Sequence, residues 1–143
     1  RLVNNSLQVG YKQNENVKND NVEVFITLPV LNVLALSGSG SITTTGAFDG
    51  NIDCNVTVSG SGNIHFSTGT AQNFYSKVDG SGSIYMLNMV TDKADATIIG
   101  SGKTEINASN QLKVKIIGSG KLYYRGIPII TTSITGSGTV LPK

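Results

Sequence analysis

The triplet Gly-Ser-Gly occurs six times in this chain of 143 residues. Consecutive copies start 22, 20, 20, 18 and 18 residues apart. Self-similarity at a nearly fixed period is typical of repeat architectures, in which each repeat forms one structural unit. The sequence therefore predicts stacked units with a common turn, whose glycines are Gly38, Gly40, Gly60, Gly62, Gly80, Gly82, Gly100, Gly102, Gly118, Gly120, Gly136 and Gly138.

Apolar and polar residues alternate around each triplet. Two residues before its first glycine stand Leu36, Val58, Val78, Ile98, Ile116 and Ile134, and four residues after it stand Ile42, Ile64, Ile84, Thr104, Leu122 and Val140. The positions between these columns are mostly polar, and a period of two is typical of strands with one buried face. We expect both columns to point inward and the hydroxyl of Thr104 to bond to backbone or water.

The length of the repeat selects among the all-β folds. Units of 18 to 22 residues trace about 60 to 70 Å, which suits one circuit of a solenoid, whereas a propeller blade needs roughly twice as many residues. A sandwich would not repeat the same columns, and the six-residue aliphatic period of left-handed hexapeptide helices is missing. We predict a right-handed β-solenoid, or single-stranded β-helix, with coils about 4.8 Å apart.

The first 37 residues show the same alternation less regularly. Leu7, Val9 and Tyr11 alternate, the polar stretch 12–21 is expected to loop out, and the residues from Val22 to Leu28 alternate again. We expect irregular N-terminal coils over 1–37, followed by the repeats and a terminal strand over 38–143. No linker rich in glycine or proline divides the chain, so one domain over 1–143 is predicted. The chain turns polar at once, so it does not begin with a signal peptide, and a removed leader or an upstream segment stays open as an alternative.

Composition excludes several classes of protein. Charged residues make up 14% of the chain, hydrophobic residues 38%, and the net charge is +2. This balance is not that of a disordered chain, and the scattered basic residues predict no nucleic-acid partner. No apolar run approaches the roughly 20 residues of a membrane span. The single cysteine, Cys54, falls on an inward position and is expected to be a buried structural thiol.

Motifs that would carry chemistry fail on inspection. The run 99–104 imitates the end of a phosphate-binding loop, but Thr97 stands where that loop needs glycine. The triplets lack the following Asp of calcium-binding β-rolls, so we expect neither metal nor cofactor. Asp49 and Asp53 could reach the separation of paired glycosidase carboxylates, but a solvated turn is the favoured interpretation. We therefore expect no catalytic residues and no enzyme activity.

One outward column combines aromatic and polar side chains. Five residues after each first glycine stand Thr43, His65, Tyr85, Glu105 and Tyr123. Rings with polar tips suit stacking against a sugar or another protein, and solenoids bind along such faces. We take His65, Tyr85, Glu105 and Tyr123 as the candidate ligand-binding residues. The alternative is that the aromatic pairs only stabilise the sheet.

Several segments together resemble one bacterial family. They are the run 22–26 leading to 29–40, the recurring Gly-Ser-Gly-x-Ile, and the closing run 124–128 followed by 134–138. In these the chain is similar to the family described as putative auto-transporter adhesin, head GIN domain. The resemblance implies a right-handed β-helix exported to the periplasm or cell surface, and it brings no catalytic motif.

Two functional classes follow from the pattern and the resemblance. The first is a non-catalytic binding or adhesion module, outside the cell or in the periplasm, for a glycan or a cell-surface protein. The second is a structural or envelope-assembly domain that associates with itself through the solenoid ends. An enzyme acting on polysaccharides is a distant third.

Overall fold

Parallel pairing between successive repeats builds the fold, in a computed structural model that describes residues 1–3, 6–10 and 22–143. The strands are β1 (Leu2–Val3), β2 (Ser6–Leu7), β3 (Val33–Gly38), β4 (Ser41–Thr43), β5 (Ala47–Gly60), β6 (Asn63–His65), β7 (Thr68–Gly80), β8 (Ser83–Gly100), β9 (Lys103–Gly118), β10 (Lys121–Arg125), β11 (Ile129–Gly136) and β12 (Thr139–Pro142). Within the described ranges there is no helix, and so none able to cross a membrane.

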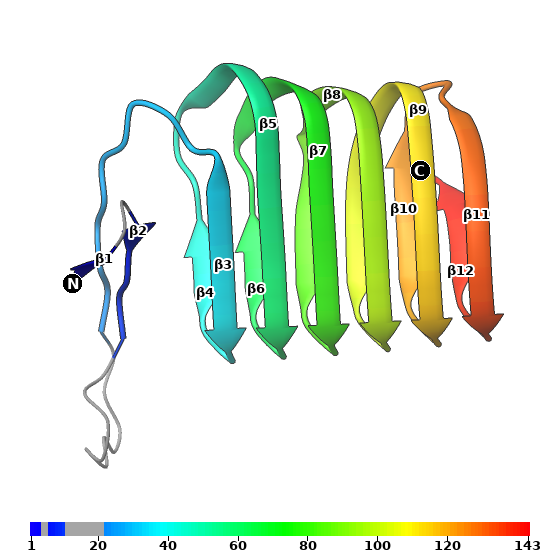
Figure 1. The fold of residues 1–143 in the computed structure, drawn as a ribbon, viewed down its shortest axis with the longest axis horizontal. Coiled ribbons are helices and arrows are strands. Elements are labelled where there is room, and N and C mark those ends of the chain that lie inside the picture. Colours follow the sequence, from blue (N-terminus) through cyan, green and yellow to red (C-terminus); the bar gives the residue numbers. More distant parts are fainter. Residues whose placement is uncertain (4–5, 11–21) are drawn as a thin grey trace.

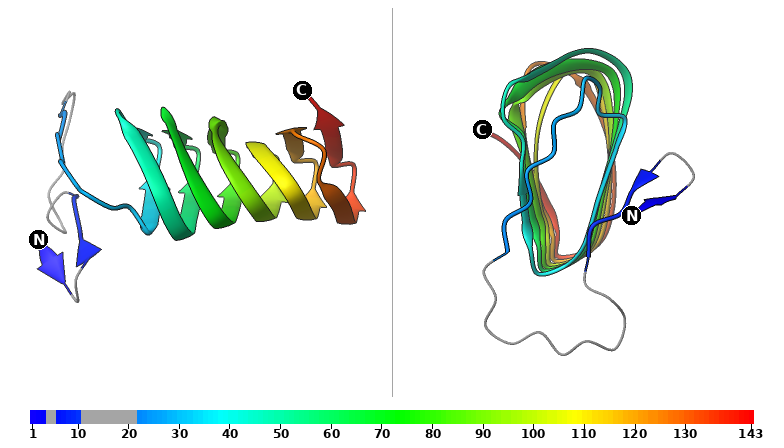
Figure 2. Two further views of the ribbon diagram at one scale, coloured as in Figure 1. Left: turned by 90° about the horizontal axis from the view of Figure 1, so that it is seen from above. Right: turned by 90° about the vertical axis from the view of Figure 1, so that its left-hand side faces the viewer.

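Each coil is a flattened loop with two sheet faces (Figure 2). Sheet 1 contains β3, the C-terminal parts of β5, β7, β8 and β9, and β11. Sheet 2 contains β4, β6, the N-terminal parts of β8 and β9, β10 and β12. In Figure 1 the strands of sheet 1 descend in front, those of sheet 2 ascend behind, and the stack advances to the right. This is a right-handed winding, as predicted.

The Gly-Ser-Gly turns join sheet 1 to sheet 2 along one edge of the stack. The first glycine of every triplet has a positive φ, for example 106° at Gly100. A Cβ on Gly100 would also lie 2.6 Å from the carbonyl oxygen of Gly80 in the preceding coil. Ser101 N donates to that same oxygen at 3.0 Å. The turn therefore needs glycine both for its backbone conformation and for the close approach of the next coil.

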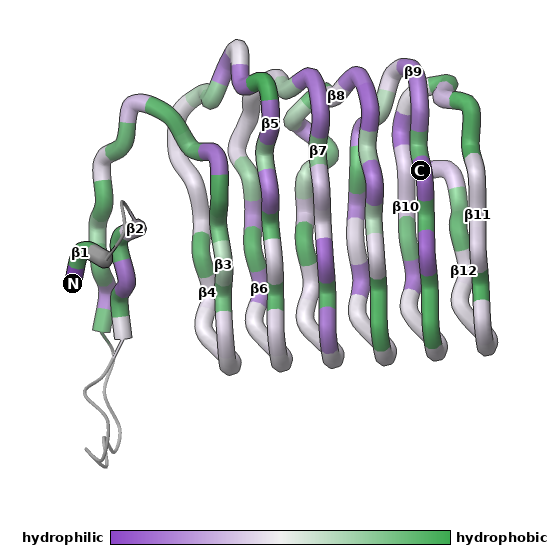
Figure 3. The backbone as a smooth tube through the Cα atoms, viewed as in Figure 1, coloured by the Kyte–Doolittle hydropathy of each residue, from purple (hydrophilic) through white to green (hydrophobic). Residues whose placement is uncertain are grey.

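The inward columns fill the interior of the coils. Figure 3 shows hydrophobic and hydrophilic residues alternating along the strands, and the largest fully buried side chains are Phe74, Ile64, Ile84, Met86, Met89, Ile98, Ile106, Leu112, Ile116, Leu122, Val56 and Val58. Cys54 is 1% exposed, and burial raises the pKa of its thiol to about 11. It is the structural thiol that the sequence predicts.

Thr104 lies in this interior as expected, but the backbone bond expected as one option for its hydroxyl is not formed. Its side chain is fully buried, and none of the described residues forms a hydrogen bond with Oγ1. The neighbouring inward side chains, Ile84 and Leu122, are both aliphatic and so offer the hydroxyl no side-chain partner. An unpaired buried hydroxyl costs stability.

The N-terminal part differs from the predicted coils. Strands β1 and β2 form a short antiparallel hairpin, and the residues from Val22 to Leu28 form no strand. Their side chains are exposed, and Leu31 is the one buried residue between 22 and 32. The expected strand is therefore wrong, because alternation yields a ladder only where a neighbouring strand supplies backbone partners. The predicted alternation at Tyr11 and the predicted loop at 12–21 lie outside the described residues.

Candidate functional site

The outward column predicted from the sequence lies in register on the outer surface of sheet 2. Direct pairs join Thr43 to His65, His65 to Tyr85, Tyr85 to Glu105, and Glu105 to Tyr123. We call His65, Tyr85, Glu105 and Tyr123 the ladder. His65 is exposed, the two tyrosines are partly exposed, and Glu105 is buried. The ladder is thus continuous, but its members differ in access to solvent.

His65 and Tyr85 stack on each other. Their ring centroids are 4.4 Å apart and their planes differ by 12°. The two residues are paired on adjacent strands of sheet 2, whose spacing of about 4.8 Å brings outward rings into this distance. Each ring therefore covers one face of the other at this end of the ladder.

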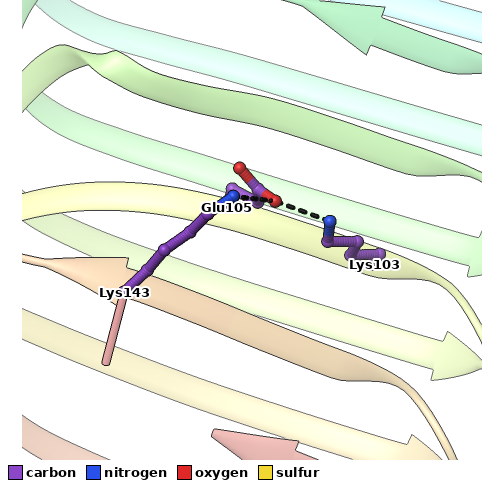
Figure 4. Close-up of polar contacts among 3 residues, drawn as sticks. All are labelled: Lys103, Glu105 and Lys143. Atoms are coloured by element: carbon purple, nitrogen blue, oxygen red, sulfur yellow. Dashed lines mark hydrogen bonds and ion pairs between the residues drawn. The ribbon is translucent and has the colours of Figure 1, made fainter. Parts of the chain in front are cut away.

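Glu105 is held by two lysines (Figure 4). Lys103 Nζ lies 2.6 Å and Lys143 Nζ 2.7 Å from the same oxygen, Glu105 Oε1. The side chain of Glu105 is 6% exposed, whereas those of Lys103 and Lys143 are 35% and 42% exposed. Solvent therefore meets the ammonium groups rather than the carboxylate.

Lys103 and Glu105 favour each other's charged form. Burial opposes ionisation of Glu105, but the hydrogen bonds and charges of Lys103 and Lys143 outweigh it and lower the pKa of its carboxyl. The hydrogen bond to Glu105 raises the pKa of Lys103, against a smaller effect of burial. One carboxylate and two ammonium groups leave the cluster with a net positive charge.

The tyrosines of the ladder flank the same lysines. Lys103 Nζ lies 5.0 Å from the ring centroid of Tyr85 and 5.1 Å from that of Tyr123, and Lys143 Nζ lies 5.9 Å from Tyr123. These are cation–π distances. A backbone bond of 2.8 Å from Lys143 N to Tyr124 O places Lys143 beside the ladder.

Sequence reasoning missed both lysines as site residues. Lys103 could have been found, because it lies two residues before Glu105 and therefore shares its face. Lys143 gave no comparable signal, since it follows the last repeat and its side chain crosses to β9.

Asp49 and Asp53 do not form part of this cluster. Both are exposed in β5; Asn73 Nδ2 donates to Asp53 at 2.9 Å, and the Thr70 hydroxyl donates to Asp49 at 3.4 Å. Outside residues 4–5 and 11–21, no three His, Cys, Asp or Glu side chains are close enough to hold a metal ion together.

Sheet 1 carries a surface feature that the sequence did not indicate. Tyr75, 45% exposed, borders two shallow hollows of about 330 and 180 Å³. Asp95, between them, is paired with Lys113 at 3.2 Å. These hollows lie on the outer face of the other sheet and share no residue with the ladder.

Solved structures with the same fold come from Parabacteroides. A putative lipid binding protein from Parabacteroides distasonis is 28% identical, with a TM-score of 0.69 over 78% of this chain and 52% of its own. A putative adhesin from P. distasonis is 22% identical, with a TM-score of 0.68 over 78% of this chain and 55% of its own. A putative adhesin from P. merdae is 20% identical, with a TM-score of 0.62 over 76% of this chain and 57% of its own. The chain thus spans about half the length of each.

A comparison with curated proteins found no match. The family model described as putative auto-transporter adhesin, head GIN domain, matches residues 1–128, which is most of the chain. The match includes the ladder and Lys103 and ends before β11. On this match, the chain belongs to the putative auto-transporter adhesin, head GIN domain family.

Proposed function

We propose that this domain is a non-catalytic binding module, exported to the bacterial periplasm or cell surface, that recognises a glycan through the ladder. The family name and the names of two similar structures refer to adhesion, and a third refers to lipid binding. All of these names describe binding rather than catalysis, which supports this class of function.

The packing of the coils supports a site on the outer surface. Large side chains such as Phe74, Met86 and Met89 are fully buried inside the coils. A core packed in this way leaves its outer sheets to make contacts with a ligand, as in other solenoids.

The observation that carries the proposal is the in-register aromatic ladder. Adjacent strands lie about 4.8 Å apart, so the ladder from His65 to Tyr123 spans about 14 Å, the length of two or three sugar rings. The tyrosine rings offer apolar contact, and their hydroxyls and His65 offer hydrogen bonds. Glu105 is less available than the sequence suggested, because Lys103 and Lys143 occupy its exposed side.

A glycan array with the wild-type chain and the double variant Tyr85→Ala/Tyr123→Ala tests this proposal. We expect the wild type to bind at least one glycan and the double variant to lose that binding. Tyr75→Ala is the matched control, because Tyr75 is an exposed tyrosine on sheet 1. Unchanged binding by the double variant, or loss with Tyr75→Ala alone, would contradict the ladder as the site.

A second candidate function rests on the end of the solenoid. Ile127 and Ile129, just before and at the start of β11, are 95% and 72% exposed, and among the described strands β11 pairs with β9 alone. An apolar strand edge of this kind favours stacking on another domain, as an envelope-assembly element would need. Analytical ultracentrifugation tests this candidate. It would be favoured if the chain associates with increasing concentration, if Ile129→Lys abolishes that association, and if the wild-type chain binds no glycan on the array.

A further inference from the structure

The outer face of sheet 2 is positively charged near its C-terminal end. Lys103, Lys121, Arg125 and Lys143 lie on β9 and β10 and just after β12, and Glu105 is the acidic side chain among them. Four basic side chains and one acidic side chain give this part of the surface a formal side-chain charge of +3, although the side chains of the whole chain sum to only +2. Such a surface attracts anions in preference to neutral molecules.

Glu105 brings two of these charges together. Lys103 and Lys143 donate to the same oxygen of Glu105, so their nitrogens lie within about two hydrogen-bond lengths of each other. An ammonium group has three donors, and each of these lysines uses one on Glu105. Both therefore present further donors to solvent, one on each side of this oxygen (Figure 4).

Two aromatic rings flank this pair of donors. Tyr85 and Tyr123 belong to the coils before and after Glu105, and Lys103 Nζ lies about equally far from both ring centroids. A sugar ring in contact with the exposed part of either tyrosine would bring a substituent of that sugar close to the lysines. A carboxylate has two oxygens, so it could accept a charge-assisted hydrogen bond from each lysine.

We propose that the ladder recognises an acidic glycan and that Lys103 and Lys143 together bind the carboxylate of one uronic acid residue in it. This inference rests on the proposed function, since it names the class of glycan that the same ladder binds. Glu105 does not contact the ligand; it holds the two ammonium groups side by side.

The test compares two probes that differ only in charge. They are tetragalacturonate and the same tetrasaccharide with its carboxyl groups reduced to alcohols, titrated into the 143-residue chain by calorimetry. We expect the acidic probe to bind with a dissociation constant at least ten-fold lower, and its affinity to fall when salt is raised from about 0.05 to 0.5 M.

Variants locate the binding on the molecule. Lys103→Gln/Glu105→Gln/Lys143→Gln removes the cluster without leaving an unpaired buried charge, and it should weaken tetragalacturonate binding at least ten-fold and flatten its salt dependence. Lys77→Gln/Asp79→Asn/Lys115→Gln is the matched control, because it removes two lysines and one acid from exposed positions of sheet 1. This control should bind within two-fold of the wild type.

The outcomes separate the two proposals. Equal binding of both probes, or equal loss in both triple variants, overturns the acidic ligand and leaves glycan binding standing. No binding of either probe also overturns it, and the array with Tyr85→Ala/Tyr123→Ala then decides the proposed function by itself.

If the cluster variant does not fold, as judged by its thermal transition, Lys143→Gln replaces it. Lys143 is 42% exposed, and its removal keeps the pair between Lys103 and Glu105.

Discussion

Lys143 Nζ donates to Glu105 Oε1 at 2.7 Å, although 38 residues separate the two in the sequence. The bond reaches from the residue after β12 across β10 to β9, and it meets Lys103 at the same oxygen. The buried carboxylate is thereby kept ionised on an outer face of the solenoid. The cluster contributes to stability as well as to the chemistry of that face.

Replacing Glu105 should reveal this contribution through its pH dependence. Because the pKa of Glu105 is lowered in the folded chain, its stabilising effect is present above the ordinary value of about 4.3 and is lost as the pH falls through the lower folded-state pKa. We expect Glu105→Gln to lower the free energy of unfolding at pH 7 by about 1 to 2 kcal/mol. Urea unfolding at several pH values measures the difference, which should vanish in acid. A difference that persists below that folded-state pKa would show that ionisation is not its source.

Thr104 offers a test of the unpaired hydroxyl inside the coils. Thr104→Val should be neutral or stabilise the chain by up to about 1 kcal/mol, since it removes a buried group without a partner and nearly keeps the shape. Thr91→Val is the matched control: Thr91 is equally buried, but its hydroxyl donates to Asn107 O at 3.0 Å. We expect that control to lose about 1 to 2 kcal/mol in urea unfolding. Strong destabilisation by Thr104→Val would instead indicate a polar network around Thr104.

Substituting two glycines, Gly38 and Gly100, separates the stability cost of a strained backbone conformation from the cost of disturbing the stacking of coils. Gly38 and Gly100 both have a positive φ, 98° and 106°, but a Cβ on Gly38 would meet nothing within 4 Å, whereas one on Gly100 would meet Gly80 O at 2.6 Å. Gly38→Ala should therefore cost about 1 to 2 kcal/mol, the penalty for a left-handed alanine. Gly100→Ala should cost clearly more, because the backbones of two coils must also separate. Equal losses in thermal or urea unfolding would mean that the stack adjusts to the extra methyl group.

The tyrosines of the ladder should be nearly dispensable for folding. Tyr85→Ala/Tyr123→Ala removes the stack on His65 and the ring contacts of Lys103, each worth about 0.5 to 1 kcal/mol at a partly exposed site. We expect a total loss of about 1.5 to 3 kcal/mol and a cooperative thermal transition. An unfolded double variant would assign the ladder a structural role.

Metal should make no difference to stability. The described part of the chain holds no cluster of metal-ligating side chains, so the melting temperature is expected to be the same in millimolar calcium and in EDTA. An upward shift of several degrees in calcium would reveal a site through its binding energy.

The spacing of the glycines and the period of two were sufficient to predict the solenoid, its turns and its inward columns. They act through local rules that hold in every coil: glycine where φ is positive and the next coil approaches closely, and aliphatic side chains on alternate residues. The register of His65, Tyr85, Glu105 and Tyr123 follows from the same spacing, because each residue occupies the same place in its own repeat.

Three features depended on tertiary structure. The residues from Val22 to Leu28 alternate like the true coils, but form no ladder, because alternation does not supply a neighbouring strand. Thr104 fits its column by shape, and only the packing around it shows that the hydroxyl has no partner. Glu105 was predicted to face a ligand, but Lys143, which follows the last repeat, covers its carboxylate and exposes an ammonium group instead. The repeat could not predict this contact, because a flexible lysine side chain is positioned by its surroundings.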